Sequence, residues 1–318
     1  MSPLARFNHI ALGCAIAAVA GACGHAQPPQ AGSATGATAS LSSAVRGASP
    51  VAEPDPAWQN TLPPGAEVFA RLRVAALLRD EHMRALVEPL AKAALARGDA
   101  RIVLAPVIER ADELVVASRA DASTDEALLV LVGVRAEVGT DAIHDAHGER
   151  AFHEVGRTDR IVEEQTADGV LSLFVLPGRT WVISGGADRL RVRRALLTAK
   201  PAPEDDDVVP LAELRLRGSD LVRRIPRLGT GMLADVGTRL DAMHLVVRSF
   251  PAEQMIVRLV YPDVDARARA ERVLTDVKDA AVRSKKLPWF EKTAVRGDGR
   301  NVTLTWELKN VPATAPSL

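Results

Sequence analysis

The chain has 318 residues, and its 40 Lys plus Arg balance its 40 Asp plus Glu, so the formal net charge is zero. A near-neutral protein lacks the overall positive charge of a nucleic-acid-binding protein. The basic stretches Arg189–Arg194 and Arg215–Arg227 also have no interleaved aromatic residues on which bases could stack. We therefore expect no nucleic-acid partner.

The N-terminal segment, residues 1–22, has the three parts of an export signal. Arg6 and the amino terminus are positive, an apolar run extends from Ile10 to Ala20, and small residues precede Cys23. As a helix, a run of about 11 residues would measure about 16 Å, against ~30 Å for the core of a bilayer. The run is too short for a stable membrane span, so we expect it to be removed.

The segment before Cys23 resembles the lipobox of bacterial lipoproteins, whose pattern is Leu, a small residue, then Gly or Ala; here Ala20 replaces the Leu. The resemblance implies a lipid on Cys23 and a location in the cell envelope, on the periplasmic face. Ordinary secretory cleavage after Ala22 is the alternative. It would leave Cys23 as a lone thiol, because Cys14 lies inside the signal. Gly24, in place of the aspartate linked to inner-membrane retention, favours the outer membrane.

Residues 23–58 are rich in Ala, Ser, Gly, Pro and Gln, and Arg46 is their only basic residue. Such a composition cannot bury enough apolar surface to fold. We expect a flexible tether with an end-to-end distance of about 30–35 Å. Through the lipid on Cys23, the membrane would be a partner of this protein.

The rest of the chain contains an internal repeat. Arg71–Arg79 and Arg215–Arg223 share five of nine residues. Each is followed by a helical stretch and two apolar strands, so order and type repeat together. We predict an α+β fold of two diverged β-α-β-β-type repeats, with a largely antiparallel sheet and helices packed on one face. The repeats are residues 59–200 and 211–311, separated by an acidic Pro-rich linker at 201–210 and followed by a tail at 312–318.

In chain order, the first strand alternates, with Ala70 and its apolar neighbours on one face. A helical stretch follows over Val74–Arg97, with a second helix starting at Pro89 and a stop at Gly98. Later patterns predict a hairpin over Ile161–Val175, an amphipathic helix over Asp265–Lys285 and a hairpin over Thr293–Leu308. The first hairpin would turn at Asp168-Gly169.

Three histidines, His144, His147 and His153, lie within ten residues. His144 and His147 could share a helix face and offer two nitrogens to zinc, with His153 or a carboxylate completing the shell. This spacing matches no zinc motif of defined mechanism. The alternative is a solvent-facing helix end and loop.

Other catalytic patterns are missing. The segment after residue 23 has no cysteine nucleophile and the chain has no Gly-x-Ser-x-Gly elbow. Ser184–Asp188 resembles a phosphate-binding turn only loosely, and we expect Asp188 to cap a helix there. Glu163 and Glu164 are adjacent in a strand and would face opposite sides of a solvated strand. We predict no cofactor.

The chain beyond the signal resembles uncharacterised duplicated α+β lipoprotein domains, a resemblance that assigns no functional residue. We expect a non-enzymatic binding or scaffold module with an envelope protein as its partner. One alternative is a metal-binding protein or metal-dependent hydrolase that uses His144, His147 and His153. A lipid carrier with a cavity between sheet and helices is a third.

Overall fold

The computed structural model describes residues 56–63, 66, 68–79, 102–118, 127–145, 147–185, 188–198, 210–224, 231–248, 253–284 and 292–307. The described elements of the first half are, in chain order, η1 (Pro56–Thr61), β1 (Val68–Leu72), α2 (Val74–Arg79), β2 (Ile102–Val103), α4 (Ala105–Ile108), β3 (Glu113–Ser118), β4 (Ala127–Val132), η2 (Thr140–Ala142), β5 (His144–Asp145), β6 (His153–Arg157), β7 (Val162–Gln165), β8 (Leu171–Val175), β9 (Trp181–Gly185) and α5 (Arg189–Thr198).

The described elements of the second half are β10 (Ala212–Arg217), α6 (Gly218–Arg224), η5 (Gly231–Leu233), α7 (Ala234–Gly237), β11 (Ala242–Arg248), β12 (Gln254–Val260), α8 (Val264–Ser284), β13 (Ala294–Asp298) and β14 (Asn301–Glu307). Cys23 and most of the expected tether lie outside the described residues, as do Pro89, Gly98 and most of the linker and the tail.

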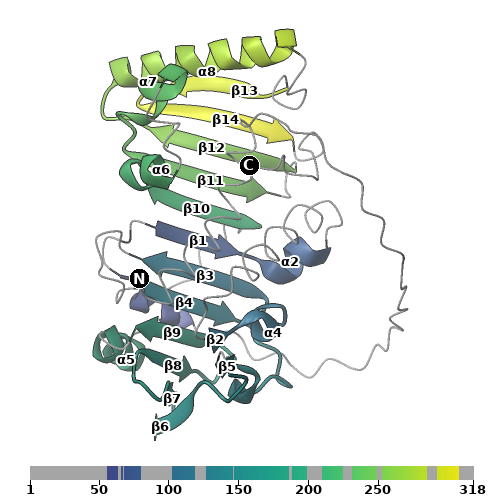
Figure 1. The fold of residues 1–318 in the computed structure, drawn as a ribbon, viewed down its shortest axis with the longest axis vertical. Helices are drawn as coiled ribbons and strands as arrows, with labels where there is room; N and C mark the ends of the chain where they lie inside the picture. The colour runs from purple at the N-terminus through teal and green to yellow at the C-terminus, as the bar shows by residue number, and fades with distance from the viewer. Residues whose placement is uncertain are drawn as a thin grey trace.

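The fold is α+β, with one large antiparallel sheet and few helices (Figure 1). Twelve strands follow the order β13-β14-β12-β11-β10-β1-β3-β4-β9-β8-β7-β6. The halves share this sheet because β1 pairs with β10 at its centre, in the register Val68 to Leu216, Ala70 to Leu214 and Leu72 to Ala212. A separate two-stranded sheet joins β2 to β5.

Strand order runs outward from the central pair in the same way on both sides. In the first half β1 pairs with β3, β3 with β4, β4 with β9, and β9 with β8. In the second half β10 pairs with β11, β11 with β12, β12 with β14, and β14 with β13. In each half, therefore, the strand that comes last in the chain is inserted beside the third strand out from the centre. The first half adds β7 and β6 at its edge.

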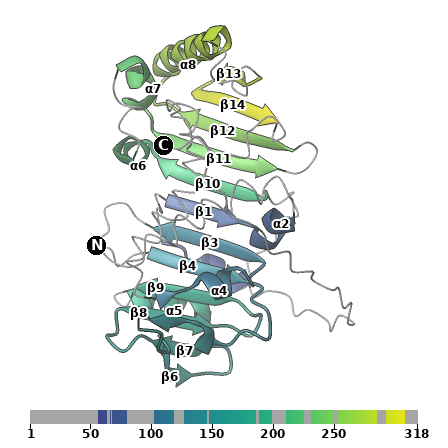
Figure 2. The same ribbon diagram turned by 45° about the vertical axis from the view of Figure 1, so that its right-hand side comes forward.

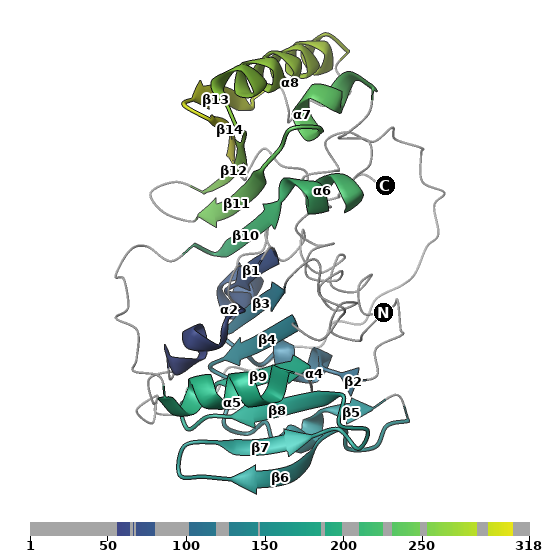
Figure 3. The ribbon, with the colours of Figure 1, turned by 90° about the vertical axis from the view of Figure 1, so that its left-hand side faces the viewer.

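One face of the sheet carries the main core across both halves. Alternate side chains point to this face, and they include Leu129 and Ile183 in the first half and Leu245 and Val257 in the second. In the second half α6, α7 and α8 cover this face, through Leu221, Val236, Ala266, Ala270 and Leu274. Figure 3 shows α6 and α7 together on one side of the sheet.

The expectation that all helices pack on one face is wrong for the first half. Val192 and Leu196 of α5 join a second core on the opposite face, with Val115, Val130 and Val182 of the sheet. Trp58 of η1 is buried in the same core, so residues 56–58, which we expected to belong to the tether, are part of the folded structure. The apolar residues of β3 and β4 face both ways, which is why these strands are buried on both faces.

Both edges of the sheet are protected against pairing with another strand. At one edge, α8 lies against β13 (Figure 2), and the Glu271 carboxylate accepts a hydrogen bond from the Gly297 backbone N–H at 2.8 Å. At the other edge, β6 carries a bulge between Glu154 and Gly156 and exposes charged side chains. Bulges, charges and covering helices are the usual means of blocking an edge.

The strongest sequence patterns are confirmed. Helix α8 matches the predicted amphipathic helix within one residue at each end. Both hairpins form, and their turns contain Gly169 and Gly299 with positive φ values of 67° and 52°. Ala70 is buried, as the alternation in the first strand predicted.

Candidate binding surface

The structure does not place the three histidines as a helical metal site. His144 lies in strand β5, His147 in a turn and His153 at the start of β6. The prediction that His144 and His147 share a helix is therefore wrong. All three histidine side chains are exposed. Within the described ranges, no group of three or more His, Cys, Asp or Glu is arranged to hold a metal ion.

Asp145 organises the turn that follows His144. Its Oδ1 atom accepts hydrogen bonds from the backbone N–H groups of His147, at 2.8 Å, and Glu149, at 2.9 Å. The hydrogen bond from Glu149 is the main reason that the pKa of Asp145 lies below its usual value. Gly148 takes a positive φ of 82° within the turn. This arrangement accounts for the local sequence as a tight turn, without a ligand.

Glu163 and Glu164 in β7 face opposite sides of the sheet as expected, but both are buried, so the prediction of a solvated strand is wrong. Glu163 pairs with Arg189 and, at 3.5 Å, with Arg193, both on α5. On the other face, Glu164 Oε1 accepts hydrogen bonds from Arg150 Nη2 at 3.1 Å and Thr140 Oγ1 at 2.9 Å. Each carboxylate joins a peripheral segment to the sheet.

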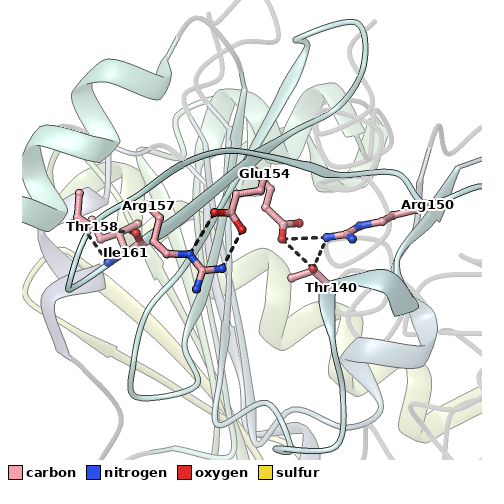
Figure 4. Close-up of polar contacts among 7 residues, drawn as sticks. Thr140, Arg150, Glu154, Arg157, Thr158 and Ile161 are labelled. Atoms are coloured by element: carbon pink, nitrogen blue, oxygen red, sulfur yellow. Dashed lines mark hydrogen bonds and ion pairs between the residues drawn. The ribbon is translucent and has the colours of Figure 1, made fainter.

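Figure 4 shows the polar contacts at this end of the sheet, where Arg150 lies beside Thr140. Arg150 Nη2 also donates to Thr140 Oγ1 at 3.1 Å, which closes a three-residue network with Glu164. Next to it, Arg157 donates two hydrogen bonds to the carboxylate of Glu154, at 3.1 and 2.8 Å. The second pair is exposed, so we interpret this region as a stabilised edge.

The turn before α5 serves the fold. Asp188 is buried at the start of the helix, and its carboxylate accepts hydrogen bonds from Arg191 at 2.6 and 2.5 Å. Arg191 also donates to the backbone oxygen of Thr61 at 2.9 Å. This contact fixes η1 against α5 and gives Asp188 a structural role, while residues 186 and 187 of the expected turn lie outside the described residues.

A network of charged side chains lies at the centre of the sheet, where the halves meet. On β1, Arg71 pairs with Glu113 of β3, its Nε and Nη2 atoms 2.6 and 3.0 Å from the carboxylate. On β10, Glu213 accepts hydrogen bonds from Arg215 at 2.7 Å and contacts His244 Nε2 of β11 at 2.8 Å. Arg71 and Glu213 are direct partners across the β1–β10 pair.

Charge stabilises the ionised form of Glu213. Its hydrogen bond with His244 is the largest contribution that lowers the pKa of this carboxyl, and Arg215 lowers it further. Partial burial opposes both by raising the pKa, but the net shift is downward. Glu213 is therefore a fixed negative charge that orients Arg215 and His244.

Two rows of side chains run outward from this centre on the same face of the sheet, each across successive cross-strand pairs. We call them row 1 and row 2. Row 1 consists of Arg71, Val115, Val130, Val182 and Phe174. Row 2 consists of Arg215, His244, Arg258, Thr303 and Arg296.

The two rows differ in burial, since row 1 is largely covered and row 2 is largely exposed. The four apolar members of row 1 are buried beneath α5 and η1. In row 2, Arg215, Arg258 and Arg296 are exposed, and His244 and Thr303 are half-buried. A parallel strip beside row 2 holds Val246, Ile256, Thr305 and Ala294. No helix or strand of the described chain packs on row 2, so this surface is our candidate for binding.

Row 2 was missed in the sequence because its members are far apart along the chain. A signal was present, since His244, Arg258 and Thr303 each occupy a polar position within an alternating apolar strand. Alternation alone predicts a solvated face. Only the register of four strand pairs shows that these positions line up.

Comparisons with known proteins give no assignment. No family model matches the chain, and no curated protein matches it. Among solved structures, crystal form I of TP0453 aligns with a TM-score of 0.49 and 13% identity, covering 83% of this chain and 98% of that one. A similarity at this level says nothing about activity. Within the described residues, no helix is long and apolar enough to cross a membrane.

Proposed function

We propose that this protein is a cell-envelope lipoprotein, anchored through Cys23, whose folded part is a non-enzymatic binding or scaffold module. The observation that carries the proposal is the contrast between the two faces of β10–β14. One face is packed against α6, α7 and α8. The other presents row 2 and the strip beside it, with no covering element in the part of the chain that is described.

We also infer that the halves are diverged copies of one unit. The matching outward strand order supports this, as does the register of the central pair. When Arg71 is aligned with Arg215, Ala70 corresponds to Leu214, and these two residues face each other. On either side Val68 faces Leu216 and Leu72 faces Ala212, so corresponding positions exchange places. This reciprocity is expected of two copies related by a two-fold axis.

The anchor is tested by replacing Cys23 with Ser in the full chain. Because the lipid is attached through the cysteine thiol, the variant should not incorporate radiolabelled palmitate. It should also move from the membrane fraction to the soluble fraction. A Cys14→Ser variant is the control, because Cys14 lies within the segment we expect to be removed. Unchanged membrane association of Cys23→Ser would contradict the anchor.

The binding face is tested by photocrosslinking in intact cells. A benzophenone amino acid at Thr303, in row 2, should yield an adduct of discrete mass. The same amino acid at the exposed Thr275 of α8 should not. Comparable adducts at both positions would overturn the proposal. So would an adduct yield at Thr303 that is no higher than the yield at the same position in a Cys23→Ser background.

A further inference from the structure

We propose that row 2 binds an acidic, amphipathic helix of a partner protein. This inference rests on the proposed function and names the chemistry of its partner. The argument compares the two rows, which start at the corresponding residues Arg71 and Arg215 and cross four strands outward in the same order.

Row 1 shows that this face of the sheet accepts a helix. Val192 and Leu196 of α5, one turn apart, are buried in the same apolar cluster as Val115, Val130 and Val182. At the outer end, Glu163 is the direct neighbour of Phe174 and pairs with two arginines of the helix. The helix is thus held by an apolar centre and one acidic end of the row. The basic charge is on the helix and the acidic charge on the sheet.

Beyond the shared first arginine, row 2 has a polar or basic side chain wherever row 1 has an apolar one. Val115 corresponds to His244, Val130 to Arg258, Val182 to Thr303 and Phe174 to Arg296, because each pair occupies the same step outward from the centre. In row 1, the valines and the phenylalanine at these positions pack in the apolar cluster that includes α5. Arginine, histidine and threonine supply hydrogen-bond donors and positive charge instead.

The positive charge of row 2 is only partly neutralised. Glu213 balances Arg215 and contacts His244. Arg258 and Arg296 have no hydrogen-bond or ion-pair partner among the described residues, and both are exposed. Beside them, Val246 and Ile256 offer a half-buried apolar strip. A complementary partner therefore carries carboxylates along one side and apolar groups along the other.

A helix fits this surface better than an added strand. Strand addition needs a free sheet edge, and here Glu271 occupies the Gly297 N–H of β13 while β6 is bulged. The side chains of row 2 project from the face of the sheet, and only the last of them, Arg296, belongs to the edge strand β13. A helix with carboxylates at i and i+4 presents them on one side, in line, with apolar residues adjacent.

The test is binding of a synthetic peptide of about 20 residues, long enough to be helical in isolation, with Glu at i and i+4 and Leu on the adjoining face. The protein is the full chain with Cys23→Ser, which we expect to lack the lipid anchor. Fluorescence anisotropy should show saturable binding. Arg258→Glu with Arg296→Glu should weaken it at least tenfold. The control, Arg135→Glu with Arg160→Glu, changes net charge equally at exposed sites in the first half and should stay within twofold.

A peptide of the same composition with two central prolines cannot form the helix and should bind at least tenfold more weakly. Equal binding of the two peptides, equal weakening by the two double variants, or no binding to the wild-type chain would overturn the acidic-helix proposal. Such a result leaves the adduct at Thr303 unaffected. Failure of this inference and failure of the proposed function are therefore distinguishable.

Discussion

Arg215 lies directly opposite Phe69 across the β1–β10 pair, with its guanidinium carbon 5.5 Å from the centre of the ring. Phe69 belongs to the first half and Arg215 begins row 2 in the second. The same guanidinium group donates to Glu213 at 2.7 Å. The first residue of the candidate binding row is thus held by contacts from both halves.

This contact should be measurable as a coupling energy. A double-mutant cycle with Phe69→Leu and Arg215→Gln, followed by urea unfolding, should give about 0.5–1 kcal/mol, the usual value for an exposed cation–π pair. The control cycle combines Phe69→Leu with Arg258→Gln, two residues that are not neighbours in the sheet, and should be additive. A coupling energy of zero in the first cycle would show that the ring does not hold Arg215.

The lowered pKa of Glu213 predicts a pH dependence of stability. Because its folded-state pKa lies below the ordinary 4.5, ionised Glu213 stabilises the fold above that value, and this stabilisation is lost as pH falls through the lowered pKa. Between about pH 6 and about pH 3, the wild-type chain should therefore lose more free energy of unfolding than Glu213→Gln does. Parallel losses for the two proteins would contradict the assigned shift.

Glu163 should contribute more to stability than Glu154, although both pair with arginine. The Glu163 side chain is 5% exposed and the Glu154 side chain 45%. Glu163→Gln should lower the free energy of unfolding by about 2 kcal/mol, less than for a fully buried pair because Arg189 and Arg193 reach solvent. Glu154→Gln should have little effect. Chemical denaturation of both variants checks the ranking, and equal losses would refute it.

Gly218 should be intolerant of a side chain. It is buried, and a Cβ atom there would overlap the backbone carbonyl of Leu240, which cannot rotate away. Gly218→Ala should therefore destabilise the protein by about 1–3 kcal/mol. Gly156→Ala is the matched control, since its nearest neighbour, Glu163 Oε2, would be 3.8 Å away. Thermal unfolding separates the two, and a small effect at Gly218 would count against this packing.

The local elements could be predicted because their signals are local. The apolar stripe of α8 and the glycines of the two hairpin turns each lie within one short segment. The repeated Arg-Leu-Arg segments also indicated two related halves, but not that β1 and β10 would pair to form one sheet. Strand pairing depends on contacts between distant residues, which periodicity does not contain.

The predicted site failed for a related reason. The spacing of His144 and His147 suggested a shared helix face, but Asp145 accepts hydrogen bonds from the backbone N–H groups of His147 and Glu149, which favours a turn. Glu163 looked solvated because the arginines that bury it come from α5, a separate segment. Row 2 required the register of four strand pairs. For Glu163 and row 2 the deciding partners come from other segments of the chain, whereas Asp145 lies within the histidine segment itself.

The most direct test of the account asks whether the charges of row 2 bring the protein to its partner. The measurement is the yield of the photocrosslinked adduct at Thr303, in intact cells, in an Arg258→Gln, Arg296→Gln background. Arg135→Gln with Arg160→Gln is the reference. The account predicts at least a fivefold fall in yield relative to that reference. An unchanged yield, with the variant folded and membrane-bound, would contradict it.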